Sequence, residues 1–409
     1  MRASHGSIAA AALAISISLA AQFSLRTDAG SARQPAASGR ALLSQARALM
    51  ERGRLDQDHA AYVDAEAAAR AALQLDPQSY EARAYLSVIL AGEHRFEEAI
   101  EEAKRALAIS PDSALPHGVL TDAFVELGRY EEALASCQAM LDVRPSPGAL
   151  ARAAYLHSLH GDGEGAAELL RDASAGTARG DERAWFLTQL ATEQLGIGEL
   201  AEARASVDHA LALAPNAKPA RILSARIHWA AGDQAAAQRE LAPLADGAGD
   251  PDALALLGAM SLAEGKLDEA RPRLEAARRL EQAELDAGGN ELHHLVELLL
   301  MVPGATTEAL ALAERDANRR RDIQTLDRLA RAQFFAGRAE EARISMAQAL
   351  RTGSRDPRLL VHSAEIEAAC GNPAVAREQL RAALERRAAL PPTDLARAVA
   401  LDARLRRTG

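Results

Sequence analysis

Proline recurs in this chain at intervals of 34 residues, at Pro77, Pro111 and Pro145. The same interval separates an aromatic residue fifteen positions before each proline, an alanine twelve before it and a leucine four before it. A period of this length is typical of a solenoid unit made of two helices and a turn. Proline ends each second helix because it lacks the N–H that a helix needs. The spacing therefore predicts a helical array rather than one globular core.

The composition agrees with helices and argues against several classes of partner. Alanine, leucine, arginine and glutamate predominate, and these are among the best helix formers. The net charge of -10 argues against nucleic acid, whose binding needs clustered cations. Cys137 and Cys370 fall in distant repeats without a Cys/His cluster, so we expect neither a disulfide nor a structural zinc. We expect no metal and no cofactor.

Two segments show the repeat most clearly, HRFEEAIEEAKRALAISP (94–111) and LGRYEEAL (127–134). Both resemble the tetratricopeptide repeat (TPR), which has alanine at the twentieth residue of its unit and an aromatic residue three positions earlier. We call this alanine the register alanine. Ten candidates follow one another along the chain: Ala65, Ala99, Ala133, Ala166, Ala203, Ala237, Ala270, Ala309, Ala342 and Ala376. The resemblance implies an all-α, right-handed superhelical solenoid of about ten TPR-like helical hairpins with a C-terminal capping helix.

The repeats divide the chain into four parts. An N-terminal segment (1–25) is followed by a polar linker (26–39), the TPR array (40–388), and a capping helix with a tail (389–409). The first helix of the array is expected at about 40–52.

The register loosens at two junctions, 174–183 and 281–307, where the connecting segments are longer and contain glycine. Such junctions indicate either hinges between sub-arrays or loop insertions, which surface loops absorb at small free-energy cost.

The N-terminal segment contains an apolar run, Ile8–Phe23, which predicts targeting. Small residues at Ser18 and Ala20 fit a signal-peptide cleavage site before Ala21. The run is also near the lower limit for a membrane span, so an uncleaved anchor is an alternative, and an ordinary terminus is a third. Cleavage predicts a periplasmic or secreted protein. An anchor predicts an inner-membrane protein with its array in the periplasm, and membrane contact is expected only through this segment.

The resemblance also suggests where a partner binds. In TPR proteins the second, fifth, ninth and twelfth residues of each unit face a concave groove, and we call these the inner positions. The candidate site residues there are Asp122, Val125, Tyr155, Trp185, Thr188, Arg226, Trp229, Asp327, Arg331 and Phe334. They include both tryptophans of the chain, and tryptophan and arginine dominate binding energies at interfaces. The alternative is that the tryptophans pack between adjacent repeats. We expect Arg152 to be buried and bonded to turn carbonyls or a neighbouring carboxylate.

These features predict a non-enzymatic scaffold or adaptor that binds a partner protein's peptide or helix in the groove, in the bacterial cell envelope. The partner's identity is not encoded. An alternative function is the binding of a glycan or cell-wall fragment by Tyr155, Trp185 and Trp229. An enzyme is not expected, because the sequence contains no nucleophile elbow, phosphate loop or dinucleotide fingerprint. The pairs His157/His160 and His293/His294 are expected to be exposed on helices rather than bound to metal.

Overall fold

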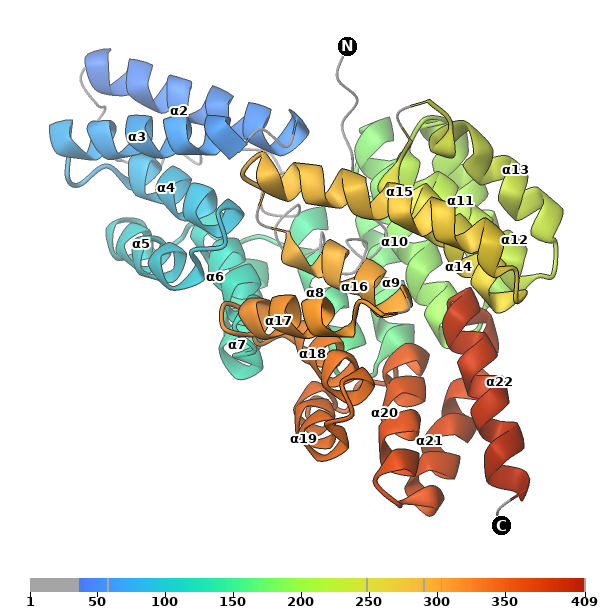
Figure 1. The fold of residues 1–409 in the computed structure, drawn as a ribbon. Helices are drawn as coiled ribbons and strands as arrows, with labels where there is room; N and C mark the ends of the chain where they lie inside the picture. The colour runs from blue at the N-terminus through green and yellow to red at the C-terminus, as the bar shows by residue number, and fades with distance from the viewer. Residues whose placement is uncertain (1–36, 57–58, 248, 290, 303, 408–409) are drawn as a thin grey trace. The chain divides into compact units, whose positions relative to one another are not determined.

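The computed structural model of the chain describes residues 37–56, 59–247, 249–289, 291–302 and 304–407. These residues are helical and contain no strand (Figure 1). The predicted signal peptide or anchor at 1–25 lies outside them, as does most of the predicted linker. None of the described helices is both long enough and apolar enough to span a lipid bilayer.

The described helices α2 to α21 follow one another along the chain as ten successive pairs, in agreement with the predicted repeat number. The pairs are α2 (Ala37–Asp56) with α3 (His59–Leu75), α4 (Tyr80–Gly92) with α5 (Phe96–Ile109), α6 (Ala114–Glu126) with α7 (Tyr130–Val143), α8 (Pro147–Leu159) with α9 (Gly163–Ala175), α10 (Gly180–Ile197) with α11 (Leu200–Leu213), α12 (Lys218–Ala230) with α13 (Gln234–Ala245), α14 (Pro251–Ala263) with α15 (Leu267–Asp286), α16 (Leu292–Met301) with α17 (Thr306–Ala317), α18 (Ile323–Phe335) with α19 (Ala339–Ala349), and α20 (Pro357–Ala369) with α21 (Pro373–Glu385). The first helix begins at Ala37 and ends at Asp56, so it is longer at both ends than predicted.

The register alanines explain why each pair packs closely. All ten have no exposed surface, as expected where the absence of a larger side chain lets two helices approach. In the pairs from α4/α5 to α20/α21, the chain reverses between the two helices through a left-handed residue, for example Gly128 with φ 67°. Glycine adopts this conformation without the steric penalty that a Cβ atom brings. The predicted register is therefore confirmed along the whole array.

The chain comprises two compact units, which we describe separately. Among the described residues, unit 1 contains those from Ala37 to Ala153 and a short piece at 288–289, and unit 2 contains Ala154–Ala287 and the residues from Glu291 onward. The main division falls inside α8, and residues 288–289 at the second loosened junction are also assigned to unit 1. The first junction lies in unit 2 and precedes a long α10, whereas the second contains the short α16.

The chain ends with a C-terminal segment, residues 386–407, that contains the short 3-10 helix η1 (Arg387–Ala389) and α22 (Pro392–Arg407). Helix α22 packs on α20 and α21, as predicted for a cap over the last repeat (Figure 1). It also contacts α14, and η1 contacts α10, α12 and α20. The C-terminal segment therefore reaches repeats far from the one it was predicted to cover.

Candidate functional site

The candidate site is a network of polar side chains in unit 2, and it begins with the way α18 and α20 start. Asp322 Oδ1 accepts hydrogen bonds from the backbone N–H groups of Gln324 and Thr325, at 2.9 and 3.0 Å. Asp356 Oδ1 accepts from the backbone N–H of Arg358 at 2.9 Å. An aspartate at this position satisfies the free N–H groups of a helix and fixes where it begins. The two neighbouring helices therefore present their inner positions in register.

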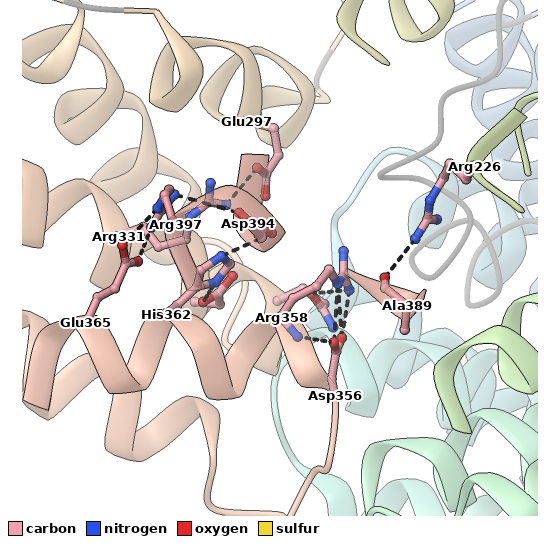
Figure 2. A network of polar contacts seen from close by, with 12 residues as sticks. Arg226, Glu297, Arg331, Asp356, Arg358, His362, Glu365, Ala389, Asp394 and Arg397 are labelled. Atoms are coloured by element: carbon pink, nitrogen blue, oxygen red, sulfur yellow. Dashed lines mark hydrogen bonds and ion pairs between the residues drawn. The ribbon is translucent and has the colours of Figure 1, made fainter. Parts of the chain in front are cut away.

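His362 of α20 is the centre of the network (Figure 2). Its Nδ1 lies 2.8 Å from Asp327 Oδ1 in α18, and its Nε2 lies 3.4 Å from Asp394 Oδ2 in α22. The three residues are 2%, 4% and 5% exposed, respectively. One imidazole thus joins two buried carboxylates from two different helices.

Arg397 makes a second connection between α22 and α20. Its Nε donates to Glu365 Oε1 at 2.9 Å, and its Nη2 donates to the other oxygen of that carboxylate. Its Nη1 lies 3.7 Å from Asp394 Oδ1, and its guanidinium carbon lies 5.1 Å from the ring centre of Phe335. A two-pronged arginine–carboxylate contact fixes direction as well as distance, so it holds α22 in one orientation.

Two further ion pairs extend the network along the inner positions. Arg331 Nη1 donates to Glu297 Oε2 at 2.7 Å, which joins α18 to α16. Arg358 Nη2 donates to Asp356 Oδ2 at 2.8 Å and to Gln324 Oε1 at 3.4 Å. The charges of these two arginines are therefore paired with carboxylates, which offsets the cost of removing them from water.

Arg226 of α12 joins the network from a distant repeat. Its Nη2 lies 3.4 Å from the carbonyl oxygen of Ala389 in η1, a contact between residues 163 positions apart (Figure 2). A second long-range approach occurs between two turns. A Cβ atom on Gly161 would lie 2.6 Å from the carbonyl oxygen of Gly353, so only glycine fits there. Unit 2 therefore closes on itself, because repeats far apart in the sequence touch.

Burial and nearby charges have opposite effects on the pKa values of His362 and Asp394. Burial alone would lower the pKa of His362, but Asp327 and Asp394 outweigh it and raise that pKa to about 8. Burial would raise the pKa of Asp394, but His362, Arg331 and Arg397 hold it well below its usual range. Burial and the nearby Arg358 lower the pKa of Arg226 to about 10. At neutral pH the network therefore consists of an imidazolium, guanidinium groups and carboxylates that hold helices together.

The predicted site residues occupy two kinds of environment. Those that are buried to more than nine-tenths are Asp122, Val125, Tyr155, Thr188, Asp327 and Arg331. Those that are half-buried are Trp185, Arg226, Trp229 and Phe334. The structure brings Asp327, Arg331 and Arg226 into the polar network. Whether any of the ten binds a partner remains a prediction.

The aromatic members of the predicted site lie in different surroundings. Trp229 packs against an apolar cluster that spans α12, α13 and α14, while part of its side chain remains exposed. Trp185 lies edge-on to Phe186, with ring centres 5.1 Å apart. Tyr155 is only 7% exposed, which leaves the two tryptophans as the accessible members of the aromatic set proposed for a glycan.

Arg152 is structural, as predicted. It is 3% exposed, and its Nε and Nη2 donate to the two oxygens of Asp122 at 2.9 and 2.8 Å. Its Nη1 donates to the carbonyl oxygen of Gly148 at 3.2 Å. The Asp122 carboxylate, which we predicted to face a partner, is therefore already bonded inside unit 1.

The histidine pairs differ from each other. His157 and His160 are exposed, as predicted. The side chains of His293 and His294 are only 3% and 10% exposed, which corrects the prediction of exposure. Their Nδ1 atoms lie 2.9 Å from Glu291 and 3.3 Å from Glu281, respectively. Among the residues that the structure describes, no group of three or more His, Cys, Asp or Glu side chains is arranged to hold a metal ion.

Sequence reasoning missed several members of the network. Arg358 and Glu365 stand at inner positions, eighteen and eleven residues before the register alanine Ala376, so the same rule applied to the last repeat finds them. His362 and Glu297 lie at other positions of the repeat. Asp394 and Arg397 lie beyond the array, where the repeat gives no signal.

Comparison with known proteins agrees with this architecture. The tetratricopeptide repeat family profile matches residues 58–122 and 90–155. No curated protein matches the chain in sequence. The solved structures that resemble it include a thermophilic TPR protein of Thermus thermophilus, with 24% identity over 47% of this chain and 99% of that one and a TM-score of 0.41. A TPR protein of Parabacteroides merdae has 17% identity, covers 65% of this chain and 99% of its own, and has a TM-score of 0.48.

Human IFIT1, solved as a dimer with m7Gppp-AAAA, has 18% identity and a TM-score of 0.50, and the match covers 76% of this chain and 72% of that one. At this level of identity the likeness concerns the fold. The sequence match over residues 58–155 and the succession of helical pairs along the chain agree with a tetratricopeptide repeat protein.

Proposed function

We propose that the protein is a non-enzymatic scaffold that binds a peptide or helix of a partner protein at the inner positions of unit 2. TPR repeats generally serve protein–protein interaction, and this chain carries the side chains that such binding needs. One observation supports the proposal most directly. The half-buried residues at the inner positions of α10, α12 and α18 include two tryptophans, an arginine and a phenylalanine.

These residue types favour binding for physical reasons. Trp185, Trp229 and Phe334 can bury large apolar areas with few rotatable bonds, so ordering them costs little entropy. Arg226 has a pKa lowered by burial and by Arg358, which indicates that its positive charge is incompletely compensated. A partner that supplies a carboxylate or carbonyl oxygen to this guanidinium would compensate it.

Site-specific photocrosslinking in the native cell tests the proposal. A photoreactive phenylalanine analogue replaces Trp229, and the matched control places the same analogue at Ile344, which is 57% exposed on α19. We expect a protein adduct at position 229 and none at position 344. Adducts only at position 344 would show that binding uses another face, and thermal melts of both variants verify that the array remains folded.

We also propose that the protein acts in the bacterial cell envelope, on the basis of the apolar run Ile8–Phe23. Mass spectrometry of the mature N-terminus checks this. A first residue of Ala21, or an intact segment in the membrane fraction, supports the placement. An intact Met1 in the cytosolic fraction contradicts it.

A further inference from the structure

The C-terminal segment lies across the inner positions of unit 2, and three contacts hold it there. Arg226 Nη2 donates to the carbonyl oxygen of Ala389, His362 pairs with Asp394, and Arg397 binds Glu365 (Figure 2). These contacts join η1 and α22 to α12 and α20. The segment is therefore attached at both of its parts rather than only at the last repeat.

The opposite side of the segment is apolar. Leu390, Ala398, Leu401 and Leu405 form a buried cluster with residues of α20 and α21. Helix α22 is thus amphipathic, with one face in a core and the other directed to charged side chains. An amphipathic helix laid against a concave helical surface is a common way for one protein to bind another.

The contacts use the surface that a partner would use. Arg226 and Glu365 both stand at inner positions and both bind the segment directly. Asp327, a third inner residue, acts through His362. The segment therefore occupies these groups in the isolated chain.

We infer that the C-terminal segment is an intramolecular occupant of the partner-binding surface of unit 2, and that a partner binds by replacing it. The inference rests on the proposed function, since it concerns the same surface. The occupant also indicates the chemistry of the partner, which we expect to present an amphipathic helix. This helix has a carboxylate in its first turn, as α22 has Asp394, and an accessible carbonyl oxygen before it, as at Ala389.

The position of Asp394 explains why a first-turn carboxylate is the recognised feature. A carboxylate there is stabilised by the partial positive charge of the helix N-terminus. It also faces His362 and lies near Arg331 and Arg397, so it meets three cationic groups at once. A helix with a neutral residue at this position would leave those cations uncompensated.

A synthetic peptide of residues 386–407 tests the inference with the full-length protein. Fluorescence anisotropy measures its binding to the wild-type chain and to the Asp394→Asn chain. We expect the variant to bind about tenfold or more tightly, because the apparent dissociation constant is the intrinsic constant divided by the fraction of chains whose own segment has left. The wild-type chain competes with a tethered segment at a high effective concentration. The matched control peptide, with Asp394→Asn, should bind neither chain.

Hydrogen exchange of the same two full-length proteins supplies a second readout. We expect amides of α22 to exchange at least about tenfold faster in the variant, while those of α4 and α6 remain unchanged. Equal peptide binding by both chains together with equal protection of α22 would overturn the inference. Should Asp394→Asn unfold the protein, Arg397→Gln replaces it as the variant. The Arg397 side chain is 25% exposed, so we expect its replacement to destabilise the fold less than that of the buried Asp394.

This test separates the inference from the proposed function, because it requires no cellular partner. Peptide binding that depends on Asp394, without any photocrosslinked protein at position 229, would support the C-terminal segment as an intramolecular occupant and contradict the proposed scaffold function. A photocrosslinked partner whose yield is the same in wild-type and Asp394→Asn cells would retain the scaffold and reject displacement.

Discussion

Units 1 and 2 share one repeat but bury different groups at their inner positions. In unit 1 these positions are mostly small or apolar, for example Ala84, Val88 and Val125, and one buried ion pair, Asp122–Arg152, joins residues 30 positions apart. In unit 2 they carry charges, and contacts reach residues 163 positions apart. Unit 1 is thus held by neighbouring repeats, as expected of a solenoid, whereas unit 2 also has long-range closure.

The comparison shows that the most regular repeats and the large or charged inner side chains lie in different units. The family profile matches residues 58–155, which are nearly all in unit 1. The half-buried tryptophans and the polar network lie in unit 2. Small inner side chains suit close packing between repeats, whereas large and charged ones can hold a further segment.

The largest expected effect comes from breaking the buried ion pair of unit 1. Arg152→Met leaves Asp122 buried without its cation, which should lower the free energy of unfolding by about 3–5 kcal/mol. Urea denaturation can assign the loss to one unit, because both tryptophans, Trp185 and Trp229, lie in unit 2. We expect the far-UV circular dichroism transition to shift while the tryptophan fluorescence transition does not.

A double variant is the control. Arg152→Met combined with Asp122→Leu should recover most of the lost stability, because it removes both charges. A joint shift of the two spectroscopic transitions in the single variant would contradict the expectation that the loss of stability is confined to unit 1.

The next largest effect concerns the closure of unit 2. Gly161 and Gly232 both have positive φ, of 81° and 84°, but only Gly161 has a neighbour where a Cβ atom would lie. Gly232→Ala should cost about 1–2 kcal/mol from backbone strain. Gly161→Ala should cost about 1–3 kcal/mol more, because it also overpacks the contact with Gly353. Equal costs, measured by the tryptophan transition, would show that the two turns do not touch in solution.

The third effect is a pH dependence of the stability with which the C-terminal segment packs on unit 2. The pKa of His362 is raised from the ordinary histidine value of 6.5 to about 8 in the folded protein. The stabilisation that the charged imidazole gives the folded state is therefore complete below pH 6.5 and is lost as the pH rises through 8. The difference corresponds to about 2 kcal/mol. The charged groups that act on the imidazole are Asp327 and Arg331 on α18 and Asp394 on α22. Asp356 at the start of α20 is also coupled to it, and Arg397 lies 3.7 Å from Asp394.

Hydrogen exchange of α22 between pH 6 and 9, corrected for intrinsic rates, measures this dependence. His362→Gln should remove it, and protection that is constant through this range in the wild type would contradict the assigned role. The lowered pKa of Asp394 has its effect at acidic pH. The stabilisation that the charged carboxylate gives the folded state is lost as the pH falls well below the ordinary carboxyl range.

The smallest effect is expected from an exposed ion pair in unit 1. Arg70 is 47% exposed and pairs with Glu66 one helical turn away on α3. Arg70→Ala should change the free energy of unfolding by about 0.5 kcal/mol or less, since such pairs are well solvated. A loss comparable to that of Arg152→Met would show that surface charge, rather than buried charge, holds unit 1 together.

Much of the fold could be predicted from the sequence because the repeat is local. Each register alanine specifies a contact within one helical pair, so ten alanines predicted ten pairs. The inner positions followed from the same register. Three residues predicted from them, Arg226, Asp327 and Arg331, belong to the polar network of unit 2. The structural role of Arg152 was predicted on the same basis.

The closure of unit 2 could not be predicted in this way. It depends on small rotations that accumulate from repeat to repeat until α12 meets η1, and a repeat motif does not specify them. The burial of His293 and His294 has a similar cause, because it depends on which helices pack over a short α16. Asp394 lies outside the register, so its pairing with His362 had no sequence signal.

The contact between Arg226 and Ala389 also has a consequence for biosynthesis. Synthesis proceeds at about 5–20 residues per second, so Ala389 follows Arg226 by roughly 10–30 s. Unit 1 can fold on the ribosome from local contacts alone during that time. The surface formed by α10, α12 and α14 stays uncovered until the C-terminal segment has been synthesised. A nascent chain is therefore open to capture by a helix-binding chaperone, or by its future partner, before its own C-terminal segment exists.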